Sequence, residues 1–108
     1  MSWTDSHGNF WLFGGNAEAQ SGTGGSLNDL WAYNPTAGTW TWIAGSSTAD
    51  IKGVYGTKGT AAASNEPGAR NSASAWSNHA GGFWVFGGQG FDSTGAGGLL
   101  NDLWEYVP

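Results

Sequence analysis

Apolar residues along this chain occur in short runs separated by turn-forming residues, without a long stretch of helical periodicity. Two runs, FWLF (10–13) and FWVF (83–86), are apolar at successive positions, so we expect both faces of these strands to be buried. DLWAYN (29–34) and TWTWIA (39–44) contain residue types that are enriched in strands, and they predict further strands. The pattern therefore predicts an all-β fold built from short antiparallel strands.

Turn signals join these strands into hairpins. SNHAGG separates FWVF from a strand predicted at 72–76, and the corresponding turn near the N-terminus is TDSHGN. PTAG joins DLWAYN to TWTWIA; Pro35 presets φ for a turn, and Gly38 can take the positive φ that ends it. Each unit is predicted to hold four strands, a to d in chain order.

The chain contains one passage twice. A shift of 73 aligns residues 1–35 with 74–108 without a gap, and 17 of the 35 pairs are identical. The chain is therefore one period of 73 residues plus 35 residues of the next. We expect a first blade at 1–44 with strand a truncated at its start, a long loop at 45–68, and a second blade at 69–108 with strands a to c but no strand d. The total is about seven strands.

A four-stranded sheet with two apolar faces needs a neighbour on each side, which a radial array of blades provides. A two-sheet sandwich within one chain is the alternative, although the strict period favours the array.

FWLFGG and FWVFGG, followed by NDLWAYNPTAGTWTW in the first copy, resemble the kelch repeat of β-propellers, the fold of the galactose oxidase central domain. That motif has a double Gly ending its second strand, a Tyr in its third strand and a Trp in its fourth. The matching positions are Gly14–Gly15 and Gly87–Gly88, Tyr33 and Tyr106, and Trp40; Trp31 and Trp104 recur beside them as further packing positions. PGARNSASAW (67–76) resembles the innermost strand of the family.

The resemblance implies kelch-like blades of four-stranded antiparallel sheet, about two per chain. The period of 73 exceeds the roughly 50 residues usual for the family, and the excess lies in the segments 45–68, 14–25 and 87–98. Two blades cannot close a ring, so we expect homo-oligomerisation into a closed propeller of about six to eight blades from three or four chains.

This reading predicts a structural or interaction module that self-assembles and has no catalytic activity of its own. The alternative is a carbohydrate- or small-ligand-binding propeller that uses loop aromatics and the central channel.

The amino-acid composition disfavours several classes of binding partner. The formal net charge is −5 with three cations, which disfavours nucleic acid and anionic membrane surfaces. The absence of Cys excludes disulfides and thiolate metal sites. The N-terminus MSWTDSHG has neither the basic start nor the apolar stretch of a signal peptide, and no apolar run reaches the ~20 residues that span a bilayer, so localisation stays open.

Residues suited to chemistry are few, and we expect no cofactor. His7 and His79 lie in predicted turns and do not align with each other. The copper site of galactose oxidase uses Tyr and His ligands and a Cys-linked Tyr, which this chain cannot rebuild. Asp92, Asn101 and Asp102 are weak Ca²⁺ candidates; the repeated Asn-Asp pair instead favours side chains that bond backbone amides before strand c.

Loops supply the remaining candidates. GQGFDSTGAGG (88–98) has no Lys-Ser/Thr ending for phosphate and is predicted to be a loop. Long loops in compact repeats are often binding loops, which makes Tyr55 and Phe91 ligand candidates. By analogy with the family, Arg70 is expected to face the central channel. The alternative interpretation, which we favour, is an ion pair with an Asp of a neighbouring strand.

Overall fold

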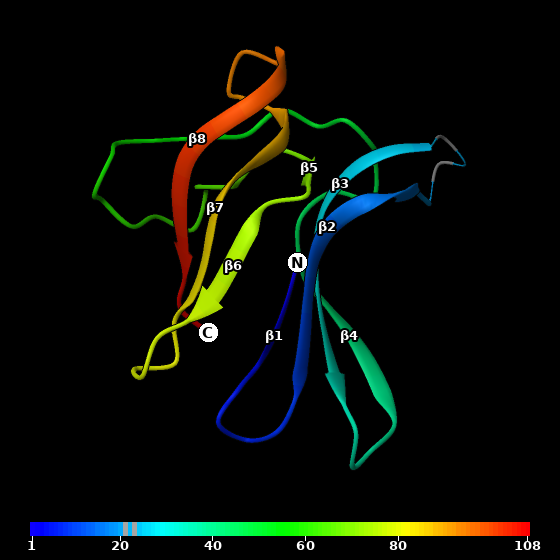
Figure 1. Ribbon diagram of the computed structural model, residues 1–108. Helices are drawn as coiled ribbons and strands as arrows, with labels where there is room; N and C mark the ends of the chain where they lie inside the picture. The colour runs from blue at the N-terminus through cyan, green and yellow to red at the C-terminus, as the bar shows by residue number, and fades with distance from the viewer. Residues whose placement is uncertain (21, 23) are drawn as a thin grey trace.

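A computed structural model describes residues 1–20, 22 and 24–108. In this part of the chain the fold is all-β, with two antiparallel sheets that face each other and no helix long and apolar enough to cross a membrane (Figure 1).

The first sheet has the strand order β1-β2-β3-β4, with every neighbouring pair antiparallel. Its strands are β1 (Ser2–Thr4), β2 (Phe10–Glu18), β3 (Gly24–Asn34) and β4 (Thr39–Ala44). The four strands predicted for the first copy are therefore present. Gly38 has a φ of 69° and donates its N–H to the carbonyl of Asn34, as the predicted turn requires.

The second sheet consists of β5 (Arg70–Asn71), β6 (Ser74–Ser77), β7 (Phe83–Phe91) and β8 (Gly97–Tyr106). Both β5 and β6 pair with the same edge of β7, and β8 pairs with the other edge. The predicted strand a is thus split in two. The split falls at Ser72, whose φ of 57° breaks the extended backbone, and it brings the strand count to eight instead of about seven.

The Gly-rich stretches extend the central hairpins instead of forming loops. Pairing between β7 and β8 continues from Phe86 past a register shift to Phe91↔Gly97. The prediction of a loop over 88–98 is therefore wrong at both ends, since only 92–96 leave the ladder. The double Gly does not end the strand; it forms a bulge in which Gly87 adopts a φ of 66°, so the strand bends and pairing resumes.

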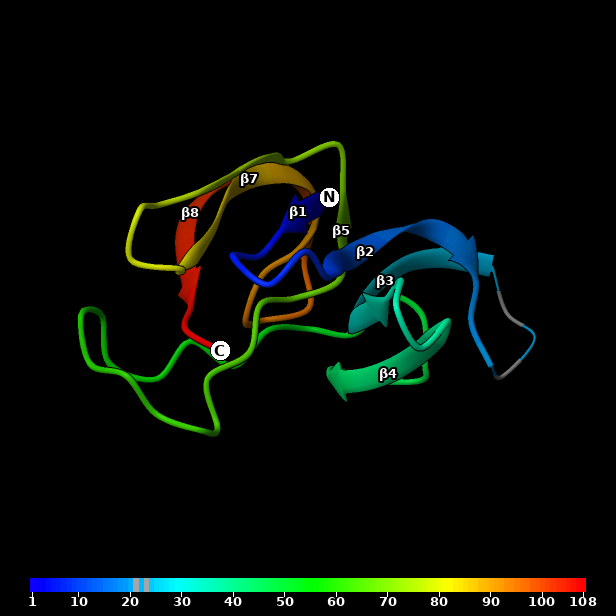
Figure 2. The same cartoon turned by 90° about the horizontal axis from the view of Figure 1, so that it is seen from below.

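The core lies between the two sheets. Figure 2 shows the sheets from below. Its buried members are Trp3, Trp11, Phe13 and Leu30 from the first sheet and Phe83 and Val85 from the second. The Phe83 ring lies 5.3 Å from that of Trp3 and 5.1 Å from that of Trp11, between ring centroids. These aromatic contacts, one stacked and one tilted, join the sheets across the centre of the molecule.

Each central strand buries only one face in this chain. Trp11 and Phe13 are 8 % and 5 % exposed, whereas Phe10 and Leu12 are 49 % and 42 % exposed. The prediction that both faces of FWLF are buried is therefore wrong for the chain on its own. The reason is that each sheet has one neighbouring sheet and turns its other face outward.

The two sheets meet through opposite faces: the face that one sheet buries corresponds, by the repeat, to the face that the other sheet exposes. The residues equivalent by the 73-residue shift to the buried Trp3, Phe13 and Leu30 are Trp76, Phe86 and Leu103, which are 45 %, 46 % and 53 % exposed. Conversely, the equivalent of the buried Phe83 is the exposed Phe10. A side chain buried in one sheet is thus turned outward in the other, as in a stack of units that all point the same way.

The segment between β4 and β5 crosses to the second sheet and lies along it. Gly53 donates to the carbonyl of Asp92, Ala69 donates to Ile51, and Val54 forms a bridge with Glu66. Residues 56–64 between these contacts are exposed. This crossing positions the side chains described next.

Candidate functional site

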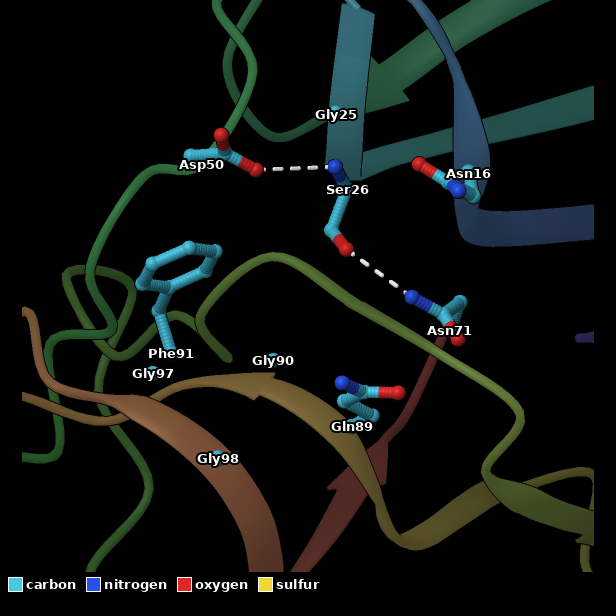
Figure 3. A pocket seen from close by; sticks show the side chains of 10 residues that line it. All are labelled: Asn16, Gly25, Ser26, Asp50, Asn71, Gln89, Gly90, Phe91, Gly97 and Gly98. Carbon is cyan, nitrogen blue, oxygen red and sulfur yellow. Dashed lines mark hydrogen bonds between the residues drawn. The ribbon is translucent and has the colours of Figure 1, made fainter.

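A cavity of about 440 Å³ opens between the ends of the two long hairpins, and Figure 3 shows the side chains around it. Its lining consists of Asn16, Gly25, Ser26, Asp50, Asn71, Gln89, Gly90, Phe91, Gly97 and Gly98. The cavity exists because the strands continue past their glycine bulges and carry both hairpins beyond the core.

Hydrogen bonds fix part of this lining. The Asp50 carboxylate accepts the Ser26 N–H at 2.8 Å, and the Asn71 amide donates to the Ser26 hydroxyl at 3.0 Å. Asn16 and Gln89 are exposed beside them, and Phe91 supplies an aromatic ring (Figure 3). Amides that both donate and accept, next to one apolar ring, match the surface of an uncharged polyhydroxyl molecule.

A second cluster surrounds the carboxylate of Asp102 on β8. The Arg70 guanidinium donates two hydrogen bonds to it, at 2.6 and 2.8 Å, as a bidentate ion pair. The Tyr55 hydroxyl donates at 2.6 Å and the Trp104 indole at 2.8 Å. Arg70 is fully buried and also donates to the carbonyls of Gly68 and Gly87. Its side chain thus forms the ion pair rather than facing a channel.

The cluster shifts two pKa values. Burial by itself would raise the pKa of Asp102, but hydrogen bonds from Arg70, Tyr55 and Trp104 outweigh burial and lower it from 3.8 to about 2. Burial, together with the hydrogen bond and charge of Asp102, raises the pKa of Tyr55 from 10.0 to about 12. The carboxylate is therefore held ionised and the phenol neutral, as expected for a cluster that locks a loop in place.

The calcium candidates lie in different environments. Asp92 accepts bonds from Thr94 and Ala96 in its own turn, while Asp102 is engaged with Arg70, Tyr55 and Trp104, and Asn101 is exposed. Within residues 1–20, 22 and 24–108, no group of three or more His, Asp or Glu side chains is placed to hold a metal ion.

The ligand candidates named from the sequence separate into two places. Phe91 lines the polar cavity, whereas Tyr55 and Arg70 belong to the Asp102 cluster. The Tyr55 ring meets the Trp104 ring edge-on, with centroids 5.2 Å apart.

The packing positions divide between core and outer face. Gly14–Gly15 and Gly87–Gly88 form the bulges of β2 and β7. Tyr106 contacts the rings of Trp11 and Phe83 at the core. Tyr33 and Trp40 pair on the outer side of the first sheet, where Trp31 packs on Trp42.

Sequence reasoning missed the polar residues that organise the cavity, namely Asp50, Asn71 and Gln89. Asp50 and Asn71 bond Ser26 across 24 and 45 positions, so no local pattern links them. Asn28 did carry a signal, since Asn recurs before Asp in both copies. It is 1 % exposed, accepts the Ser46 N–H and donates to the carbonyl of Pro67, so it ties the crossing segment to the first sheet.

Comparison with protein-family models, with curated proteins and with solved structures found no match in any of the three.

Proposed function

We propose that this protein is a non-catalytic interaction module whose two outer sheet faces bind each other between copies of the chain, closing a kelch-like propeller. The observation that carries the proposal is that the two sheets pack together through opposite faces of the repeat. The two faces left exposed are the repeat equivalents of the two faces that already bind each other inside the chain.

The outer face of the first sheet is apolar and largely aromatic. Register places one set of side chains on it: Phe10, Leu12, Trp31, Tyr33, Trp40 and Trp42. Three pairs of these rings are already in contact within the face. An exposed patch of this kind is typical of a surface that binds another protein.

The outer face of the second sheet provides the complementary surface, formed by Trp76, Trp84, Phe86 and Leu103. Trp76 and Trp84 are stacked, with centroids 6.3 Å apart and planes 6° from parallel. Their equivalents, Trp3 and Trp11, both contact the ring of Phe83 inside the chain. By the same geometry Trp76 and Trp84 of one copy receive Phe10 of the next.

Self-association of this kind is heterologous, because one face meets a different face, and it closes only if rotation returns to the start. Three or four chains would supply the six to eight sheets of a propeller ring. Each 100 Å² of apolar surface removed from water contributes about 2.5 kcal/mol before association entropy is subtracted. The alternative of a two-sheet sandwich would place polar side chains on both outer faces, where this chain has aromatic ones.

Native mass spectrometry and light scattering after size exclusion test the proposal. The expected result is one discrete species at three or four times the chain mass of 11.2 kDa, stable over a wide concentration range. A folded monomer at every concentration would contradict it, and so would an open series of oligomers without a preferred size.

The polar cavity favours a second function, binding of a carbohydrate. Phe91 can stack on a sugar ring while Asn71 and Gln89 bond hydroxyl groups, and all three line the same cavity. A glycan array should then give hits that weaken at least tenfold in Phe91→Ala and Gln89→Ala. Val54→Ala, an exposed loop residue away from the cavity lining, is the matched control. A blank array would remove this candidate.

A further inference from the structure

The polar cavity between the two long hairpins contains one carboxylate, that of Asp50, and the fold holds it in place (Figure 3). The Asp50 N–H donates to the carbonyl of Ser26 at 2.8 Å, and the Asp50 Oδ1 accepts the Ser26 N–H at 2.8 Å. The φ of Asp50 is 59°, in the left-handed region that Asp tolerates better than most residues. A Cβ on Gly25 would lie 2.5 Å from Oδ1 and 2.7 Å from Oδ2, so glycine there leaves room for the carboxylate.

This carboxylate has no cationic neighbour in the cavity wall. None of the ten described residues that line the cavity is a Lys, Arg or His. Arg70 is adjacent to Asn71 in the chain, but its buried guanidinium forms the ion pair with Asp102. The net charge of −5 adds to the negative potential of the molecule. The cavity therefore presents a negative charge that no lining side chain neutralises.

The rest of the lining is uncharged and suits a sugar ring. The amides of Asn16, Asn71 and Gln89 can donate and accept hydrogen bonds. The Phe91 ring lies over Gly97, where a Cβ would be 3.4 Å from Cε1 of the ring, so this contact positions the ring beside the amides. The lining thus offers one aromatic surface, several neutral hydrogen-bonding groups and a single acidic acceptor.

We infer that the cavity selects neutral sugar residues over acidic ones and that Asp50 determines this specificity. The inference rests on the carbohydrate binding proposed above and does not depend on assembly into a ring. The Asp50 Oδ2, which Ser26 does not use, accepts hydrogen bonds from the hydroxyl groups of a neutral hexose.

An acidic sugar meets the opposite situation. A uronic acid carries a carboxylate in place of the CH₂OH group of the hexose. In a cavity of about 440 Å³ that carboxylate lies within about one Debye length (about 10 Å at 0.1 M salt) of Asp50, and no lining cation pairs with it. Like charges placed together in this way weaken binding, so the wrong ligand is rejected by repulsion.

Matched pairs of small sugars test the inference. The probes are the methyl glycosides of glucose, galactose and mannose and of their three uronic acids, titrated at pH 7 into the 108-residue chain and followed by the NMR shifts of its backbone amides. At least one neutral glycoside should bind and shift amides at 25–26 and 89–91. The corresponding uronic acid should bind at least tenfold more weakly, and the difference should shrink at high salt.

Asp50→Asn assigns the selectivity to one charge. Asn also tolerates left-handed backbone and keeps an oxygen that can accept the Ser26 N–H, so the variant removes the charge while keeping the local structure. It should bind both sugars of a pair with similar affinity. Glu105→Gln removes an acid that pairs with Trp84, at the other end of β7 from the cavity, and should keep the discrimination of the natural chain.

The outcomes separate the inference from the function on which it rests. If no neutral glycoside binds, carbohydrate binding is wrong and the selectivity falls with it. If neutral and acidic sugars bind the natural chain equally, the selectivity is wrong while carbohydrate binding stands. Discrimination that persists in Asp50→Asn, or that high salt leaves unchanged in the natural chain, would overturn the role of the Asp50 charge.

Discussion

At the scale of single residues, the Asp102 carboxylate helps to hold the crossing segment on the second sheet. It joins β5, β8 and the crossing segment through Arg70, Trp104 and Tyr55. The sequence could suggest an ion pair for Arg70 but not its partner. The two residues lie 32 positions apart, and the repeated Asn-Asp pair marks Asp29 and Asp102 alike, so it does not identify the partner of Arg70.

Replacing Asp102 by asparagine should lower the free energy of unfolding at pH 7 by about 2 kcal/mol, since the substitution removes a charge that folding stabilises. The folded pKa of about 2 lies below the ordinary 3.8. The contribution is therefore complete above pH 4 and lost as the pH falls towards 2. Urea titrations from pH 2 to pH 7 should show that slope in the natural chain and a shallower one in the variant.

Asp29→Asn is the matched control, because Asp29 accepts only the Trp31 indole among the described residues. Its cost at pH 7 should be clearly smaller. Equal costs for the two substitutions would contradict the role assigned to the Arg70 pair.

Tyr55→Phe isolates the phenol in the same cluster. Loss of one hydrogen bond to a charged acceptor should cost about 1.5 kcal/mol at pH 7. The pKa of Tyr55 is raised to about 12, so the natural chain keeps this contribution below pH 10 and loses it between pH 10 and pH 12. Ultraviolet titration of phenolate absorbance should show one late-ionising Tyr that disappears in the variant; an unchanged titration curve would contradict this assignment.

At the scale of strands and hairpins, the turn between β3 and β4 follows its sequence closely, and the two long hairpins do not. Turn residues such as Pro35 and Gly38 act locally, so their positions were predictable. The double Gly suggests a strand end because glycine disfavours extended ladders. In the fold, cross-strand pairing resumes beyond the bulge and outweighs that local preference.

The requirement for glycine in the β2 bulge can be tested by substitution. Gly14 has a φ of 58°, and a Cβ there would lie 2.8 Å from the carbonyl oxygens of Arg70 and Leu27. Gly14→Ala should therefore destabilise the protein by about 2 kcal/mol. Gly24→Ala, where a Cβ meets nothing within 4 Å, should change stability by less than about 0.5 kcal/mol. Similar thermal midpoints for the two variants would contradict this account.

At the scale of the whole molecule, the sequence predicted repeated antiparallel sheets, but it did not predict that a single chain leaves one face of each sheet exposed. Apolar runs indicate that side chains are buried, but not whether the same chain or another copy covers them. The polar cavity was unpredictable for a related reason: its side chains come from both hairpins and the crossing segment, which meet only after the sheets have packed.

Two charge substitutions on opposite faces test the direction of assembly. Phe86→Asp and Phe10→Asp should each give monomers, because each spoils one of the two different faces while both sites are already exposed in the chain. Mixed together, the variants should form a 1:1 heterodimer through the one intact pair of faces, measurable by native mass spectrometry. Val54→Asp, a similarly exposed site in the crossing segment, should assemble normally. Dimers of either single variant would indicate like faces meeting instead.

The packing of sheets through opposite faces of the repeat also has a consequence for how the length of such a chain can change. Because each sheet offers one face and accepts the other, a chain with any whole number of sheets ends in the same two surfaces. Duplicating or deleting one 73-residue unit would leave both ends compatible. In the proposed ring, the same number of sheets can then be divided among chains in several ways, so that chains of different length build the same assembly.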